Sequence, residues 1–67
     1  MSCKEEFINT YNKVFNAEGN IKSCGREYCK QLIELAIQIG DKDKHYGEVR
    51  TGFMDTDNIK ELYNSLK

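Results

Sequence analysis

The chain has 67 residues, of which 39% are hydrophobic and 31% are charged, so it has room for one small domain and for no second one. Its 10 basic and 11 acidic residues nearly cancel, to a net charge of -1, and they are spread along both halves of the sequence. This composition argues against a disordered tail, a membrane protein and a protein that binds nucleic acid through a concentrated basic face. We expect a single, mainly α domain over residues 1–67.

The first predicted element is an amphipathic helix from Ser2 to about Asn16. Ser2 followed three residues later by Glu5 matches a capping box, in which a hydroxyl and a carboxylate accept hydrogen bonds from free amides at a helix start. Gly19 is expected to stop the helix. The apolar residues recur at helical spacing and form one stripe: Phe7, Ile8, Tyr11, Val14 and Phe15.

The second predicted helix, from Ser23 to Ile39, is longer and more apolar than the first. Its main stripe consists of Tyr28, Leu32, Leu35, Ala36 and Ile39, and a second apolar edge beside it consists of Cys29, Ile33 and Ile37. More than half of this helix needs cover, so it should be the central element of the domain. Gly40 is expected to end it in the left-handed conformation.

Residues 41–54 lose the helical period, and Gly47 and Gly52 enclose a short β-branched stretch that indicates an extended segment or a β-hairpin. A last helix, about residues 55–66, follows with apolar positions at Ile59, Leu62, Tyr63 and Leu66. The sequence therefore predicts a three-helix domain, in which the long central helix packs between the other two and the extended or hairpin segment precedes the last helix.

The sequence spacing of the candidate ligands argues against both a calcium site and a zinc site. The run Asp41-x-Asp43-x-His45 resembles the start of a calcium loop, but that loop requires Gly and Glu at positions where this chain has Tyr46 and Gly52. Zinc would need Cys3, Cys24, Cys29 and His45 together. On a helix, however, Cys24 and Cys29 would point about 140° apart, unlike the close ligand pairs of structural zinc sites. We expect no metal and no cofactor.

The cysteines also indicate the cellular setting of the protein and the reactivity expected of its thiols. Three cysteines cannot all pair within one chain, and the first residues lack the apolar run of a secretory signal, so a reducing, cytoplasmic setting is expected. Cys24 lies near Arg26 in a predicted first turn and is the candidate reactive thiol. The only histidine, His45, lies well beyond it in sequence, so no nucleophile and base are expected together, and no enzymatic activity is predicted.

The remaining function is interaction with another protein. One candidate surface is the edge of the second helix at Ile33 and Ile37, which two short helices would leave uncovered. The other lies in the irregular segment, whose residue types are enriched at interfaces: Tyr46, Arg50, Phe53 and Met54. The competing interpretation is that Tyr46, Phe53 and Met54 fold back as a lid on the central helix.

We therefore predict a non-enzymatic protein-binding or regulatory module that contacts a larger protein or a second copy of itself. The alternative is a small DNA-associated regulator, because two helices joined by a short turn are typical of a helix-turn-helix. The mixed acidic and basic polar face of the second helix opposes that interpretation. A thiol or zinc protein is the third hypothesis, and no contact with a membrane is expected.

Overall fold

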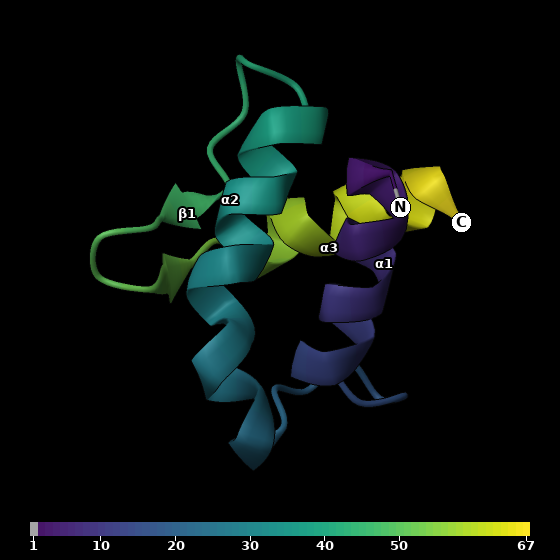
Figure 1. Ribbon diagram of the computed structural model, residues 1–67, viewed down its shortest axis with the longest axis vertical. Helices are drawn as coiled ribbons and strands as arrows, with labels where there is room; N and C mark the ends of the chain where they lie inside the picture. The colour runs from purple at the N-terminus through teal and green to yellow at the C-terminus, as the bar shows by residue number, and fades with distance from the viewer. Residues whose placement is uncertain (1) are drawn as a thin grey trace.

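The computed structural model describes residues 2–67, which form a small domain of helices and one short hairpin (Figure 1). Its elements, in chain order, are α1 (Cys3–Val14), the 3-10 helix η1 (Ser23–Tyr28), α2 (Cys29–Ile39), β1 (Gly47–Glu48), β2 (Phe53–Met54) and α3 (Thr56–Leu66). The predicted fold class is confirmed, including the three helices and the β-hairpin before the last one.

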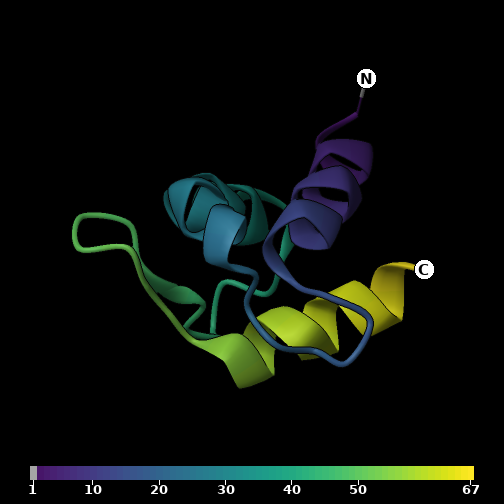
Figure 2. The same cartoon turned by 90° about the horizontal axis from the view of Figure 1, so that it is seen from below.

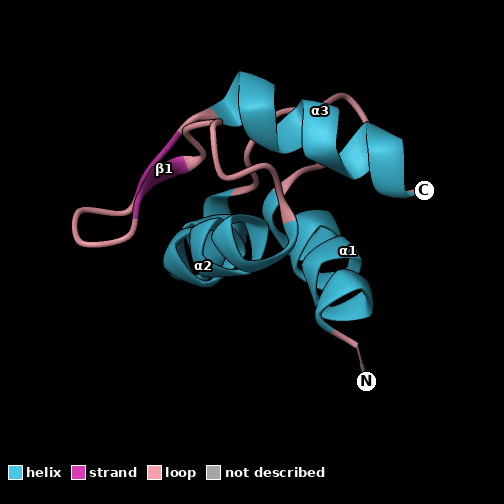
Figure 3. Cartoon of the chain, turned by 90° about the horizontal axis from the view of Figure 1, so that it is seen from above, coloured by secondary structure: helices cyan, strands magenta, loops and turns pink. Residues whose placement is uncertain are grey.

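The arrangement of these elements differs from the predicted one in the surroundings of α2. α1 packs along one side of α2, the hairpin lies on the other side, and α3 crosses both helices (Figures 1 and 3). The middle helix is thus held between a helix and a hairpin, with the last helix across them. Because the hairpin supplies a third neighbour, α2 has more cover than two short helices alone would give it.

α1 begins where the sequence predicts and ends slightly earlier. The Ser2 hydroxyl accepts a hydrogen bond from the Glu5 amide at 3.2 Å, which satisfies one of the free donors of the first turn. The helix ends at Val14 because Phe15 adopts an extended conformation and pairs with Ile21 in an isolated antiparallel bridge. This bridge closes a tight loop that returns the chain alongside the end of α1.

The segment predicted as one helix from Ser23 to Ile39 consists of two parts, since its first six residues form η1 and not α-helix. η1 packs tightly against the end of α1. A Cβ on Gly25 would lie 2.7 Å from both the Cα and the carbonyl oxygen of Val14, so only glycine fits there. The Gly25 amide donates to the Lys22 carbonyl at 2.9 Å, which is the three-residue bonding of a 3-10 turn.

Gly40 ends α2 as predicted, but by a different mechanism. Its φ of -89° and ψ of -169° are extended, so the expected left-handed conformation is wrong. A Cβ at this position would lie 2.5 Å from the hydroxyl oxygen of Tyr46, and that hydroxyl accepts a hydrogen bond from the Asp41 amide at 2.9 Å. Glycine is therefore needed here to make space for the tyrosine that closes the end of α2.

The core draws side chains from the helices, from the hairpin and from the segments that join them. Its buried hydrophobic residues are Phe7, Tyr11, Val14, Phe15, Cys29, Leu32, Ile33, Leu35, Ala36, Tyr46, Met54 and Ile59. The last helix gives only Ile59 to this set, while three more of its residues are partly buried against the core: Leu62, Tyr63 and Leu66. None of the helices in residues 2–67 combines the length and apolar character required to cross a bilayer.

Candidate functional site

The structure divides the six predicted interface residues into two groups. Three are buried in the core: Ile33 at 0% exposed, Tyr46 at 4% and Met54 at 9%. Three lie on the surface: Ile37 at 52% exposed, Phe53 at 69%, and Arg50. Tyr46 and Met54 therefore follow the lid interpretation, whereas Phe53 does not.

The apolar edge predicted on α2 is reduced to one residue. Ile33 is completely enclosed by the chain's own core, so it offers no surface to a partner, and the expectation that it is uncovered is wrong. The hairpin packs against α2 on the side away from α1, so α2 has more cover than two helices alone would give it. Ile37, one turn further along the helix, remains half exposed.

The hairpin gives Phe53 its exposed position. Gly47 pairs with Met54 and Glu48 pairs with Phe53 in the two-stranded sheet. Side chains alternate between the faces of a strand, so burying Met54 against the helices turns Phe53 outward. The turn that connects the strands projects away from the helices (Figures 2 and 3), and it carries the exposed Arg50.

The backbone of this hairpin is anchored at both ends. Near the tip, the Gly52 amide donates to the Glu48 carbonyl at 2.9 Å; at the base, the Asp55 amide donates to the carbonyl of the buried Tyr46 at 3.0 Å. The side-chain amide of Asn58, on α3, donates to the His45 carbonyl at 2.7 Å. Phe53 therefore lies on a hairpin, here called the arm, whose backbone is held in place by hydrogen bonds.

Ile37 lies on the same side of α2 as this arm. A Cβ on Gly52 would lie 3.6 Å from the side-chain methylenes of Lys30, so the hairpin tip passes close to Lys30. Residues seven apart share a face of an α-helix, which places Ile37 on the Lys30 face, about 10 Å further along the axis. We call Ile37, Arg50 and Phe53 the hairpin face.

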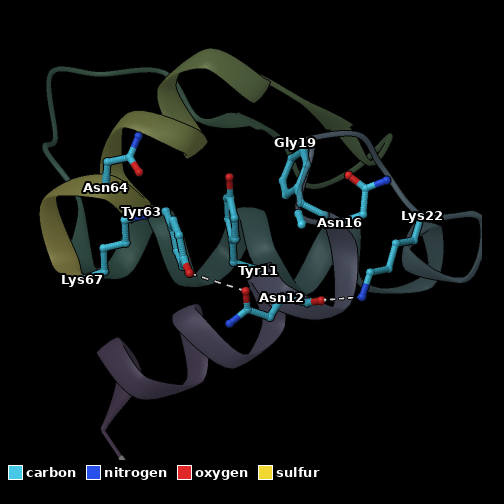
Figure 4. A pocket seen from close by; sticks show the side chains of 10 residues that line it. Tyr11, Asn12, Asn16, Gly19, Lys22, Tyr63, Asn64 and Lys67 are labelled. Atoms are coloured by element: carbon cyan, nitrogen blue, oxygen red, sulfur yellow. Dashed lines mark hydrogen bonds between the residues drawn. The ribbon is translucent and has the colours of Figure 1, made fainter.

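A second candidate site is a pocket of about 650 Å³ between α1, α3 and the loop after α1, here called the α1–α3 pocket (Figure 4). An aromatic stack lines it. The Tyr63 ring lies parallel to the Tyr11 ring with centroids 3.8 Å apart, and Phe15 lies 4.6 Å from Tyr11 on a tilted plane. Tyr11 is thereby held between two rings and is only 9% exposed.

The polar residues of the α1–α3 pocket are amides and lysines: Asn12, Asn16, Asn64, Lys22 and Lys67. Two of its hydrogen bonds converge on Asn12, whose side-chain oxygen accepts from the Tyr63 hydroxyl at 3.4 Å and whose carbonyl accepts from Lys22 Nζ at 2.9 Å. Among the described residues that line the pocket, none is Asp or Glu. Burial raises the pKa of the Tyr11 phenol, and the neighbouring Tyr63 raises it further.

Sequence reasoning missed this pocket because its parts are dispersed. Tyr11, Phe15 and Tyr63 each read as an ordinary core position on a helical stripe, and no short motif joins them to the lysines. Asn12 and Tyr63, which meet in the structure, are 51 residues apart in the chain. Only the crossing of α3 over the end of α1 brings these groups together.

The three cysteines are free and lie in different surroundings. Cys3 Sγ lies 3.6 Å from the side-chain oxygen of Gln38, and Cys29 Sγ lies 3.7 Å from the Gly25 carbonyl, while Cys24 is exposed. Burial raises the pKa of the Cys29 thiol, an effect that the nearby Arg26 partly opposes. Within residues 2–67, no three His, Cys, Asp or Glu side chains gather as a metal-binding group.

The hairpin face and the α1–α3 pocket are thus two candidate sites among the described residues. The hairpin lies beside α2 on the side away from α1, and the pocket lies where α1 and α3 meet (Figures 1 and 4). Comparison of the chain with protein-family models, with curated proteins and with solved structures gives no significant match.

Proposed function

We propose that the protein is a non-enzymatic, cytoplasmic binding module that regulates a larger protein by contacting it through the hairpin face. The observation that carries this proposal is the Phe53 side chain, 69% exposed on an arm whose opposite side is anchored in the core by Met54. An aromatic ring that is exposed to water adds nothing to the stability of the folded chain, whereas a partner that covers the ring would stabilise the complex.

The chemistry of the hairpin face supports a protein partner. Full burial of a phenylalanine side chain is worth about 1.5–3 kcal/mol, enough to act as the anchor of a small interface. Arg50 lies in the same arm and adds a planar cation, a residue type that is enriched at interface hot spots. Ile37 adds a second exposed apolar side chain, on α2.

The state of the cysteines supports the cytoplasmic setting. All three are free, and the buried Cys29 acts as a small hydrophobic core residue. Free thiols on the surface, as at Cys3 and Cys24, persist best where the surroundings are reducing.

The experiment is affinity capture from an extract of the native host, with the unmodified chain and three variants. Phe53→Ala and Arg50→Ala remove the proposed anchors, while Lys42→Ala removes one positive charge from an exposed loop outside the hairpin face and is the matched control. We expect a partner that the unmodified chain and Lys42→Ala retain and that Phe53→Ala binds at least about tenfold more weakly, which corresponds to about 1.4 kcal/mol.

Native masses and DNA binding complete this test. A mass of two chains that reverts to one in Phe53→Ala would show that the partner is a second copy. Equal capture by all four proteins would contradict the proposal, and so would tight binding to duplex DNA that weakens steeply with salt, the behaviour of a DNA-associated regulator. Circular dichroism confirms that each variant is folded.

A further inference from the structure

The α1–α3 pocket contains a polar group that the fold does not use. Tyr11 is 91% buried between Tyr63 and Phe15, yet its hydroxyl has no hydrogen-bond partner in residues 2–67. Within these residues, every side-chain oxygen or nitrogen that is sealed from water has a hydrogen-bond partner. The hydroxyl therefore has access to solvent, and Tyr11 lines the pocket. Figure 4 shows it standing in the space between the flanking residues, pointing away from Asn12.

The charged side chains that line the pocket beside this hydroxyl are of one sign. Lys22 and Lys67 line the pocket, and Lys60 Nζ lies over the Phe15 ring, 5.6 Å from its centroid. Lys67 Nζ is held in a similar way over Tyr63, at 5.4 Å. No Asp or Glu side chain is among the described residues of its lining, so the charged side chains of this pocket are all basic, in a chain whose net charge is -1.

The lysine side chains at the rim of the pocket are long and flexible, so their ammonium groups can turn toward a bound anion. Lys67 lies at the exposed end of α3, and a cation that rests on an aromatic ring in water is held by only about 0.5–1 kcal/mol, so it can turn toward a stronger partner. Lys22 already donates to a main-chain carbonyl at 2.9 Å and has further N–H donors to offer. Hydrogen bonds from an ammonium to an anion are about twice as strong as neutral ones.

We propose that the α1–α3 pocket binds a small organic phosphate, whose oxygens accept hydrogen bonds from the Tyr11 hydroxyl and from the lysines at the rim. The volume of about 650 Å³ lies in the range of small-molecule sites and exceeds what a bare phosphate would fill. The rings of Phe15 and Tyr63 and the methyl group of Ala17 give the remainder of the ligand an apolar wall. A planar group that carries a phosphate therefore fits better than inorganic phosphate.

Phenyl phosphate is the probe, and titration at low salt while amide shifts are followed by NMR is the measurement. We expect shifts concentrated in residues of the pocket, weaker binding of inorganic phosphate, and no matching shifts with benzyl alcohol, which has the ring without the charge. Benzoate distinguishes a phosphate site from one for any aryl anion, and we expect it to bind more weakly than phenyl phosphate.

Two variants and one control test the residues. Tyr11→Phe keeps the ring stack and removes only the unpartnered hydroxyl, so we expect the Kd for phenyl phosphate to rise about fivefold or more. Lys67→Gln should weaken binding and flatten its salt dependence, whereas Lys42→Gln, the same charge change outside the pocket, should leave the Kd unchanged.

Two results with the variants would overturn this proposal: an unchanged Kd in Tyr11→Phe, or an equal loss of affinity in Lys42→Gln and Lys67→Gln. Three results with the unmodified chain would also overturn it: amide shifts outside the pocket, benzoate that binds as tightly as phenyl phosphate, or equal responses to phenyl phosphate and benzyl alcohol. None of these results depends on the hairpin face, so the proposal of a phosphate ligand and the proposal of a protein partner are tested independently.

Discussion

Ile33 and Ile37 provide a matched pair with which the covering of α2 can be tested. They are the same residue type, one turn apart on one helix, yet Ile33 is 0% exposed and Ile37 is 52% exposed. Replacing each by alanine removes the same atoms and makes the same change in helix propensity. Any difference between the two variants therefore reports how completely the rest of the chain covers each position.

The expected magnitudes follow from burial. Ile→Ala at an enclosed site costs about 2–5 kcal/mol, because a cavity remains after the contacts are lost. A domain of 67 residues has a total stability of only about 3–10 kcal/mol, so Ile33→Ala should remove about a fifth or more of it and lower Tm by roughly 10 °C or more. Ile37→Ala should cost below about 1 kcal/mol, since half of that side chain is already in water.

The assay is urea unfolding followed by far-UV circular dichroism, with native mass measured in parallel. If Ile33→Ala fails to fold, Ile33→Val, at about 0.5–1.5 kcal/mol, gives the same comparison against Ile37→Val. Equal losses at the two positions would refute the reasoning, because they would mean that the rest of the chain does not enclose Ile33 in solution. A larger loss at Ile37, with a mass of two chains, would show that a second copy covers the outer face.

Three further predictions concern packing and ionisation. Gly25→Ala should cost about 1–3 kcal/mol in urea unfolding, because its Cβ would lie 2.7 Å from Val14 main-chain atoms; Glu27→Ala in the same segment should be nearly neutral, and equal midpoints would contradict the close packing. Tyr46→Phe should cost about 0.5–1.5 kcal/mol, since the Asp41 amide loses its partner; unchanged thermal stability would argue against that hydrogen bond. Folding raises the pKa of Cys29 and Tyr11 above 9.0 and 10.0, so the unfolded chain loses these protons first, and stability, complete below about pH 9, should fall as pH rises further. A urea midpoint that stays constant up to pH 11 would oppose this.

Short-range pattern was sufficient to predict the three helices, the cap at Ser2 and an extended or hairpin segment before the last helix. Helical periodicity depends on residues three and four apart, and a cap depends on a side chain within one turn, so both can be read locally. The sequence left two interpretations of Phe53 open, an exposed interface residue or part of a lid on the central helix. Strand alternation could not decide between them, because either face of a hairpin can be the buried one.

Long-range docking decided the rest. Whether Ile33 or Ile37 faces water depends on how the other elements pack around α2, and the need for glycine at position 25 depends on how closely Ser23–Tyr28 approaches the end of α1. The α1–α3 pocket exists because α3 crosses α1 and stacks Tyr63 on Tyr11, a contact between distant parts of the chain. Periodicity establishes which side chains share a stripe, whereas exposure and the assembly of a site are properties of the elements that meet that stripe in space.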